Sequence, residues 1–269
     1  RSSPRKPKVK KLLKAPSREA KVLQILLALD AASQNQDALE SAIALAAQLR
    51  AELIGLFVED IELLRSAQLP FTSEVVADSG EERSLTSKHV EKSLRAWTNQ
   101  MQSLLTREAQ KANIKCSFRT VKGRRIETLL SETGEYNLLI ISHARQQLIS
   151  PITKSDVVYL LYDGSSEAHH GVAIISEMAL QGLRNIVLID TCYEDIEYSA
   201  KKAQEWLTRH GVHVFVQKLA GDPSQSLPPL LKKYPAALLL VPAHFPLHHE
   251  SETLKALQKK LNCPVVIVR

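Results

Sequence analysis

Seven polar side chains stand directly after apolar runs of strand length, or open a helix beside them, and they form the candidate ligand-binding set. They are Asp30, Arg124, Arg125, Ser142, His143, Arg145 and Asp163. Asp30 and Asp163 end the runs at 22–29 and 157–162, where a carboxylate could bind the polar edge of a ring. Arginines that open a helix can hold a small anion. The simpler interpretation is that the aspartates cap the loops that follow them and that the other five side chains form a solvated polar rim.

These side chains depend on strands and helices that alternate along the chain after residue 20. Near-continuous apolar runs predict strands, and apolar residues at helical spacing predict helices between them. The expected strands are 22–29, 51–58, 114–121, 138–142, 157–162, 185–190, 212–219, 237–241 and 265–268, and the expected helices include 37–49, 87–112, 124–132, 194–209 and 250–261. Strands separated by helical crossovers form parallel sheets, whose carboxyl ends gather the residues that follow the strands. The predicted class is therefore α/β.

The second half of the chain repeats the plan of the first. Tyr136 lies 13 positions after Gly123, and Tyr234 lies 13 positions after Gly221. The distance from the first-strand aspartate to the glycine is 93 residues in the first half and 58 in the second, and the difference of 35 matches a polar insertion at 59–93. For this insertion we expect a short helix and then a mobile loop. The predicted division is a tail at 1–21, one domain at 22–150 and a second at 156–269.

The net charge of +6 is concentrated in the first 21 residues. This segment holds nine Lys or Arg and one Glu, so the remaining 248 residues carry 26 basic and 28 acidic side chains. Three prolines, no aromatic residues and mutual charge repulsion predict a disordered basic tail. Such a tail could contact nucleic acid, a ribosome or an anionic membrane surface, and salt would weaken each contact. The alternative is a solvated leader or a cloning remnant without function.

Composition and motifs exclude several classes of protein. The longest apolar stretches fall far below the ~20 residues of a membrane-spanning helix, and three scattered cysteines favour a reducing, cytoplasmic location. The signatures GxxxxGK(S/T), GxSxG, HExxH, HxGH and SGGxDS are absent, so we expect no enzyme activity. Cys116, Cys263, Trp97 and Trp206 are predicted to be core residues. The histidines at 244, 248 and 249 are interpreted as surface residues, with metal binding as the weaker alternative.

Five segments carry a resemblance to a known family. They are VLQILLALD at 22–30, DALESAIALAAQL at 37–49, AELIGLFVEDIELL at 51–64, LLYDGSSEA at 160–168 and CPVVIV at 263–268. Together they resemble the universal stress protein family in a tandem two-domain form, and the resemblance covers nearly everything after residue 20. It implies two tandem Rossmann-like (adenine nucleotide alpha hydrolase-like) domains of five parallel strands, an adenine-nucleotide cleft in some members, and pairing of domains through their last strands. By the same resemblance, Asp30 and Asp163 match the aspartate that contacts the nucleotide.

The sequence departs from this family at the phosphate-binding loop. Nucleotide-binding members carry Gly-x2-Gly-x9-Gly-Ser/Thr after the fourth strand, because backbone N–H groups approach phosphates most closely where no Cβ intervenes. Here neither 135–163 nor 222–269 contains a glycine. We therefore expect no ATP binding in the usual mode of the family, and no required cofactor.

The leading functional hypothesis is a non-catalytic, cytoplasmic regulatory protein of the stress response that binds an unidentified protein partner or a small effector. One alternative is a sensor that holds an adenine nucleotide or another anion in an altered cleft, at the candidate residues of either half. A second alternative is an accessory protein tethered by its basic tail. The first half lacks a clear fifth strand. If the family's pairing of domains holds, we expect the two halves to pack as an internal pseudo-dimer and the exposed edge beside Val265–Val268 to recruit a second chain into a homodimer, because unpaired strand edges tend to be covered.

Overall fold

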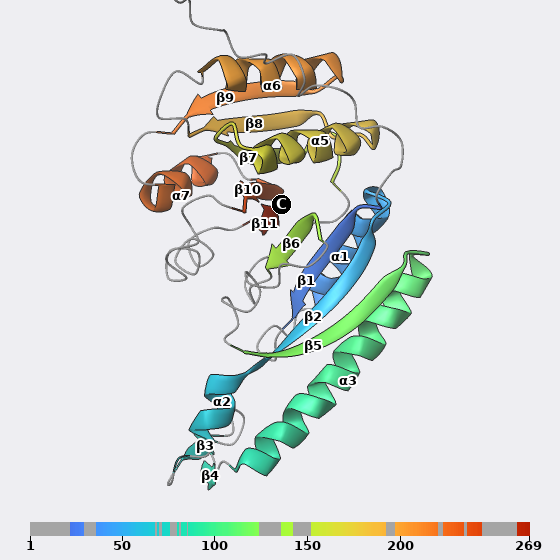
Figure 1. The fold of residues 1–269 in the computed structure, drawn as a ribbon, viewed down its shortest axis with the longest axis vertical. Helices are drawn as coiled ribbons and strands as arrows, with labels where there is room; N and C mark the ends of the chain where they lie inside the picture. The colour runs from blue at the N-terminus through green and yellow to red at the C-terminus, as the bar shows by residue number, and fades with distance from the viewer. Residues whose placement is uncertain are drawn as a thin grey trace, which may run out of the picture.

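Nine strands form one continuous sheet in the computed structural model, which describes residues 22–29, 36–67, 69, 72–75, 80, 82–84, 86–123, 136–141, 152–191, 197–219, 223–233, 236–243 and 263–269. The strands are β1 (Gln24–Leu29), β2 (Glu52–Asp60), β5 (Cys116–Gly123), β6 (Leu138–Ile141), β7 (Val157–Tyr162), β8 (Asn185–Asp190), β9 (His213–Lys218), β10 (Leu238–Pro242) and β11 (Val265–Val268). The helices are α1 (Gln36–Gln48), α2 (Ile61–Ser66), α3 (Ser87–Lys111), α5 (Ser166–Leu180), α6 (Glu197–Arg209) and α7 (Pro223–Lys233). The predicted α/β class is confirmed (Figure 1).

The sheet order is β5-β2-β1-β6-β11-β10-β7-β8-β9. In the second half, the five strands from β9 to β11 pair in parallel throughout. In the first half, β5, β2, β1 and β6 are also parallel and repeat the first four positions of that order. The halves meet where β11 pairs antiparallel with β6, from Val265 opposite Ile141 to Val268 opposite Leu138. The last strand of the second half thus lies where a fifth strand of the first half would lie.

This junction overturns the expectation that Val265–Val268 is an exposed edge. β11 is hydrogen-bonded to β10 on one side and to β6 on the other, and its four residues are at most 2% exposed. The reason is that no strand stands between β6 and β11, so the first half itself covers the edge. β11 therefore has no free edge to pair with a second chain, and the homodimer itself stays a prediction. In the sheet of the described residues, the outer strands are β5 and β9.

The two faces of the sheet carry two apolar clusters. The larger cluster lies under α1, α3, α5 and α6, and the other includes residues of α7 together with the opposite side chains of the strands. β6, β10 and β11 are buried at every position, as expected for strands covered on both faces. Trp97 packs against the larger cluster, but Trp206 is 41% exposed and its indole N–H donates to Ser176 Oγ at 3.3 Å. The prediction of a core position for Trp206 was therefore wrong.

The insertion at 59–93 contains more structure than the sequence suggested. α2 supplies the expected short helix, but the following stretch includes an antiparallel pair, β3 (Ser73–Val75) with β4 (Glu82–Ser84), instead of a loop alone. α3 runs for 25 residues, and its first turns continue past the sheet to lie beside α2, β3 and β4 (Figure 1). Polar residues predominate in α3. None of the helices in the described ranges is long and apolar enough to cross a membrane.

Candidate functional site

Most of the predicted ligand-binding set lies outside the described residues. This holds for Asp30, Arg124, Arg125, Ser142, His143 and Arg145, and also for the histidines at 244, 248 and 249. Asp163 is the member of the set that the structure places. The candidate site is therefore built from the carboxyl end of β7 and the strand beside it.

Asp163 closes the turn between β7 and α5. Its Oδ1 accepts the backbone N–H of Ser165 at 3.0 Å, and Gly164 between them takes a left-handed φ of 80° that favours glycine. Ser165 is the N-cap of α5, since its hydroxyl oxygen accepts the N–H of Ala168 at 3.0 Å. This geometry supports the interpretation of Asp163 as a loop-capping residue, which the sequence had left open.

A second carboxylate lies at the same edge of the sheet. Asp190 ends β8 directly beside Tyr162 of β7 and is 5% exposed. Thr191 follows it, and both its N–H and its hydroxyl donate to the carbonyl of Tyr162, at 3.0 and 3.2 Å. Sequence reasoning missed Asp190 as a site residue, although it ends a predicted strand and the same rule that selected Asp163 would have found it.

Tyr162 and His169 tie the first turn of α5 to the end of β7. The hydroxyl of Tyr162, a 1% exposed residue, lies 3.3 Å from Nε2 of His169, and Nδ1 of that ring lies 2.6 Å from the carbonyl oxygen of Ser165. Because a carbonyl only accepts, Nδ1 carries a proton, and in the neutral ring Nε2 accepts from the tyrosine hydroxyl. The end of β7 therefore brings together the polar residues Tyr162, Asp163 and His169, with Asp190 beside Tyr162 on the neighbouring strand.

The first half lacks this polar group at the matching positions. By the internal repeat, Leu29 and Phe57 correspond to Tyr162 and Asp190, and they pair in the same register between β1 and β2. Both are buried apolar residues, 4% and 0% exposed. The two halves have therefore diverged at their strand ends as well as in their loops.

The described residues give no support for metal or thiol chemistry. Within them, no three His, Cys, Asp or Glu side chains group closely enough to hold a metal ion. Cys263 is 3% exposed, and burial raises the pKa of its thiol to about 12. Burial also raises the pKa of Cys116, which is half-buried. Both side chains stay neutral thiols near pH 7 and serve as small packing residues, as the sequence predicted.

Comparison with known proteins gives a likeness in fold. No family profile matches the sequence, and no curated protein matches it. The solved structure of a universal stress protein from Archaeoglobus fulgidus DSM 4304 matches with a TM-score of 0.59 at 12% identity, over 91% of this chain and 96% of that one. A protein of unknown function from Pseudomonas aeruginosa PAO1 matches with a TM-score of 0.48 at 14% identity, over 92% of each chain. A member of the universal stress protein family from Burkholderia pseudomallei matches with a TM-score of 0.31 at 18% identity, over 44% of this chain and 98% of that one.

The fold assignment rests on the Archaeoglobus fulgidus structure, whose TM-score is the highest of these three. Its coverage of 91% of this chain is too large to lie in one half alone. The chain therefore has the fold of a universal stress protein across both halves of its nine-stranded sheet.

Proposed function

We propose that the chain is a tandem universal stress protein that binds a protein partner or a small effector in regulation of the stress response, without turnover. We further propose that it does not hold ATP in the usual mode of the family. The shared fold supports membership of the family. The segments after the fourth strand of each half lack the glycines of the family's phosphate-binding loop, and this supports the loss of the usual nucleotide site.

The observation that carries the proposal is the lack of glycine after both fourth strands. Residues 142–163 follow β6 and residues 243–269 follow β10 to the end of the sequence, and neither range contains a glycine. A phosphate cradle needs several backbone N–H groups in close approach, often in conformations that only glycine adopts freely. Because every residue in these two ranges carries a Cβ, the backbone N–H groups there approach a phosphate less closely than those of glycine would.

The surroundings of Asp163 support the same proposal. One of its carboxylate oxygens already accepts the N–H of Ser165, which stabilises the turn into α5. In the first half, the neighbouring positions Leu29 and Phe57 are apolar and buried, so their side chains offer no hydrogen bond to a ribose or a base.

Nucleotide titration of the full-length protein tests the proposal. Isothermal titration calorimetry with Mg-ATP, AMP and cyclic dinucleotides is expected to give no saturable heat, and the unfolding midpoint is expected to stay unchanged. A ligand at 100 times its Kd would stabilise the folded state by about 2.7 kcal/mol, so true binding would raise the midpoint measurably. Saturable heat together with such a rise would contradict the proposal.

A second candidate function is a sensor that holds an anionic ligand in an altered cleft of the second half. The placement of Asp163 and Asp190 at the ends of neighbouring parallel strands favours an adenine nucleotide over a simple anion, since ligands of open α/β sheets bind at that edge and a carboxylate can accept from the amino group of a base or from a ribose hydroxyl. If a nucleotide binds, Asp163→Asn should weaken it at least tenfold. Asp156→Asn, at the opposite end of β7, is the matched control and should leave the affinity unchanged. Equal effects of the two variants would rule out the second-half cleft.

A further inference from the structure

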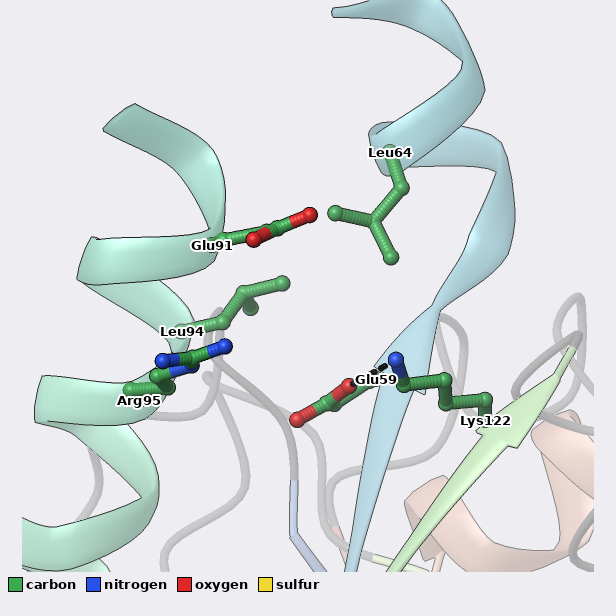
Figure 2. A pocket seen from close by; sticks show the side chains of 6 residues that line it. All are labelled: Glu59, Leu64, Glu91, Leu94, Arg95 and Lys122. Atoms are coloured by element: carbon green, nitrogen blue, oxygen red, sulfur yellow. Dashed lines mark ion pairs between the residues drawn. The ribbon is translucent and has the colours of Figure 1, made fainter. Parts of the chain in front are cut away.

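The insertion at 59–93 helps to build a cavity beside the first half of the sheet. The cavity has a volume of about 170 Å³ and lies where the ends of β2 and β5 meet α2 and the first turns of α3. Its lining residues are Glu59, Leu64, Glu91, Leu94, Arg95 and Lys122 (Figure 2). In the second half, the equivalent connection from β8 to α6 consists of residues 191–196 alone. The insertion therefore adds residues to this connection that have no counterpart in the second half.

Packing against the larger apolar cluster holds the apolar side chains of the cavity wall in place. Leu94 of α3 is 5% exposed and belongs to the larger apolar cluster, and Leu64 of α2 packs against the same cluster. α2 is held at its start because Asp60 Oδ1 accepts the N–H of Glu62 at 2.8 Å. These contacts place two leucine side chains on the cavity wall in a defined position.

Four charged side chains complete the wall, and their charges sum to zero. Glu59 and Lys122 face each other across the β2–β5 ladder, with 3.7 Å between Oε2 and Nζ. That distance is too long for a good hydrogen bond, although the Glu59 side chain is only 16% exposed. Glu91 and Arg95 extend from α3 toward α2 and the end of β2 (Figure 2).

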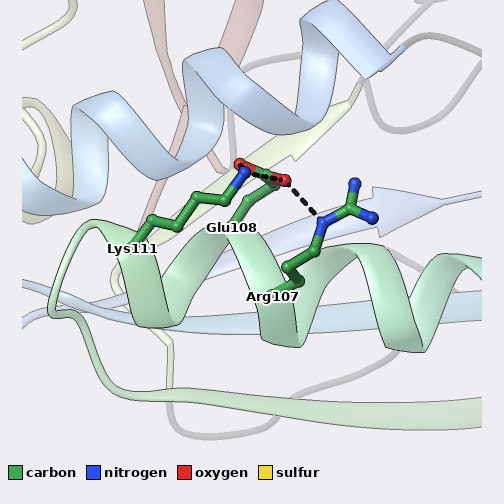
Figure 3. Close-up of polar contacts among 3 residues, drawn as sticks. All are labelled: Arg107, Glu108 and Lys111. Atoms are coloured by element: carbon green, nitrogen blue, oxygen red, sulfur yellow. Dashed lines mark hydrogen bonds and ion pairs between the residues drawn. The ribbon is translucent and has the colours of Figure 1, made fainter.

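Glu91 and Arg95 are one helical turn apart, a spacing at which opposite charges usually pair. Neither one forms an ion pair or a side-chain hydrogen bond with any residue that the structure describes. Further along the same helix, Glu108 pairs with both Arg107 and Lys111 at 2.9 Å, and these contacts lower its pKa (Figure 3). Glu91 and Arg95 are exposed and lack such contacts with the described residues, so their charged groups are open to a ligand.

We propose that this cavity binds a compact zwitterion, an α-amino acid with an apolar side chain. Arg95 and Lys122 would hold the carboxylate, Glu59 and Glu91 would hold the ammonium group, and the side chain would rest on Leu64 and Leu94. A simple anion would face two carboxylates and a simple cation would face two basic groups, whereas a zwitterion matches both sets.

The size of the cavity supports the same class of ligand. Sites for drug-sized molecules have volumes of roughly 300–1,000 Å³. At about 170 Å³, the volume of this cavity is closer to that of a single amino acid than to that of a nucleotide. The inference goes beyond the proposed function and concerns a different part of the fold, so the two fail independently.

The test uses L-leucine and two analogues that each lack one charge. Calorimetry and ligand-observed NMR on the full chain should show saturable binding of L-leucine. 4-Methylpentanoate, which lacks the ammonium group, and 3-methylbutylamine, which lacks the carboxylate, should each bind at least about tenfold more weakly, because each loses its charge-assisted hydrogen bonds. No saturable binding of L-leucine, or equal binding of either analogue, would overturn the proposal.

Matched variants on α3 locate the site. Arg95→Gln and Glu91→Gln are exposed substitutions by a good helix former, and each should lower the affinity for L-leucine about tenfold or more. Arg107→Gln makes the same change on the same helix away from the cavity and should leave the affinity unchanged. Circular dichroism checks that all three variants keep their helix content. If Arg95→Gln and Arg107→Gln bind L-leucine alike, the ligand lies elsewhere and the proposal is wrong.

Discussion

Val266→Ala tests the junction between the halves, because Val266 lies at the centre of the sheet. It pairs with Leu240 of β10 on one side and with Ile140 of β6 on the other, and it is 1% exposed. The substitution removes two methyl carbons from a buried strand. At ~0.8 kcal/mol for each buried carbon, the transfer term is about 1.6 kcal/mol, and the cavity left behind raises the expected loss to about 2–3 kcal/mol.

Val216→Ala is the matched control on the outer strand β9. Val216 is 40% exposed and pairs with Leu188 on one side of the strand. The same two carbons leave a site that is already partly in water and that closes without a cavity, so we expect a loss of about 0.5 kcal/mol. Because the substitution is the same in both variants, the difference between their losses of unfolding free energy reflects the position of each strand in the sheet.

Urea unfolding followed by circular dichroism measures both losses. The midpoints should move with unchanged slopes, since neither change alters the surface exposed on unfolding by much. Equal losses for Val266→Ala and Val216→Ala would mean that β11 is an edge strand, as its sequence first suggested. That result would refute the antiparallel pairing of β11 with β6.

Three further predictions concern the cap of α5, a buried thiol and the basic tail. Ser165→Ala removes the N-cap hydroxyl and should destabilise the protein by about 1 kcal/mol in thermal unfolding, whereas Ser166→Ala, one residue on, should cost much less. Burial raises the pKa of Cys263 to about 12 from 9.0, so its contribution to stability is complete below pH 9.0 and is lost as the pH rises toward 12; alkylation at pH 8 should spare it until denaturant is added. Deleting residues 1–21 should abolish co-sedimentation with RNA or anionic vesicles at low salt, and unchanged co-sedimentation would refute a tethering role.

Local pattern was enough to predict most of the elements. The strands at 157–162, 185–190 and 265–268 appear with the expected bounds, and α3 differs from the predicted helix 87–112 by one residue. These segments are long or strongly apolar, and their structure is decided by their own periodicity. The β3–β4 pair was missed because two strands of three residues leave too short a pattern in a polar stretch.

The position of β11 could not be read from the sequence. Its apolar run indicates a buried strand, but the identity of its second neighbour depends on whether the first half provides a fifth strand of its own. The sequence shows no clear fifth strand in the first half, and in the sheet of the described residues β6 pairs directly with β11.

The site was harder to predict than the fold. Asp163 was selected correctly as a residue at a strand end, but its role as a turn cap depends on the hydrogen bond to Ser165, which sequence spacing alone does not distinguish from a ligand contact. The insertion cavity was missed entirely. Its six lining residues come from four elements, and only the packing of α2 on α3 brings them together.

Native mass spectrometry of freshly purified full-length protein tests the central claim most directly, because one spectrum reports both the subunit count and any nucleotide that copurifies. We expect species built from the 30.0 kDa chain without the added mass of ATP, AMP or a cyclic dinucleotide. A stoichiometric nucleotide adduct that survives gel filtration would contradict it, since it would mean that the chain binds phosphates without the glycine loops.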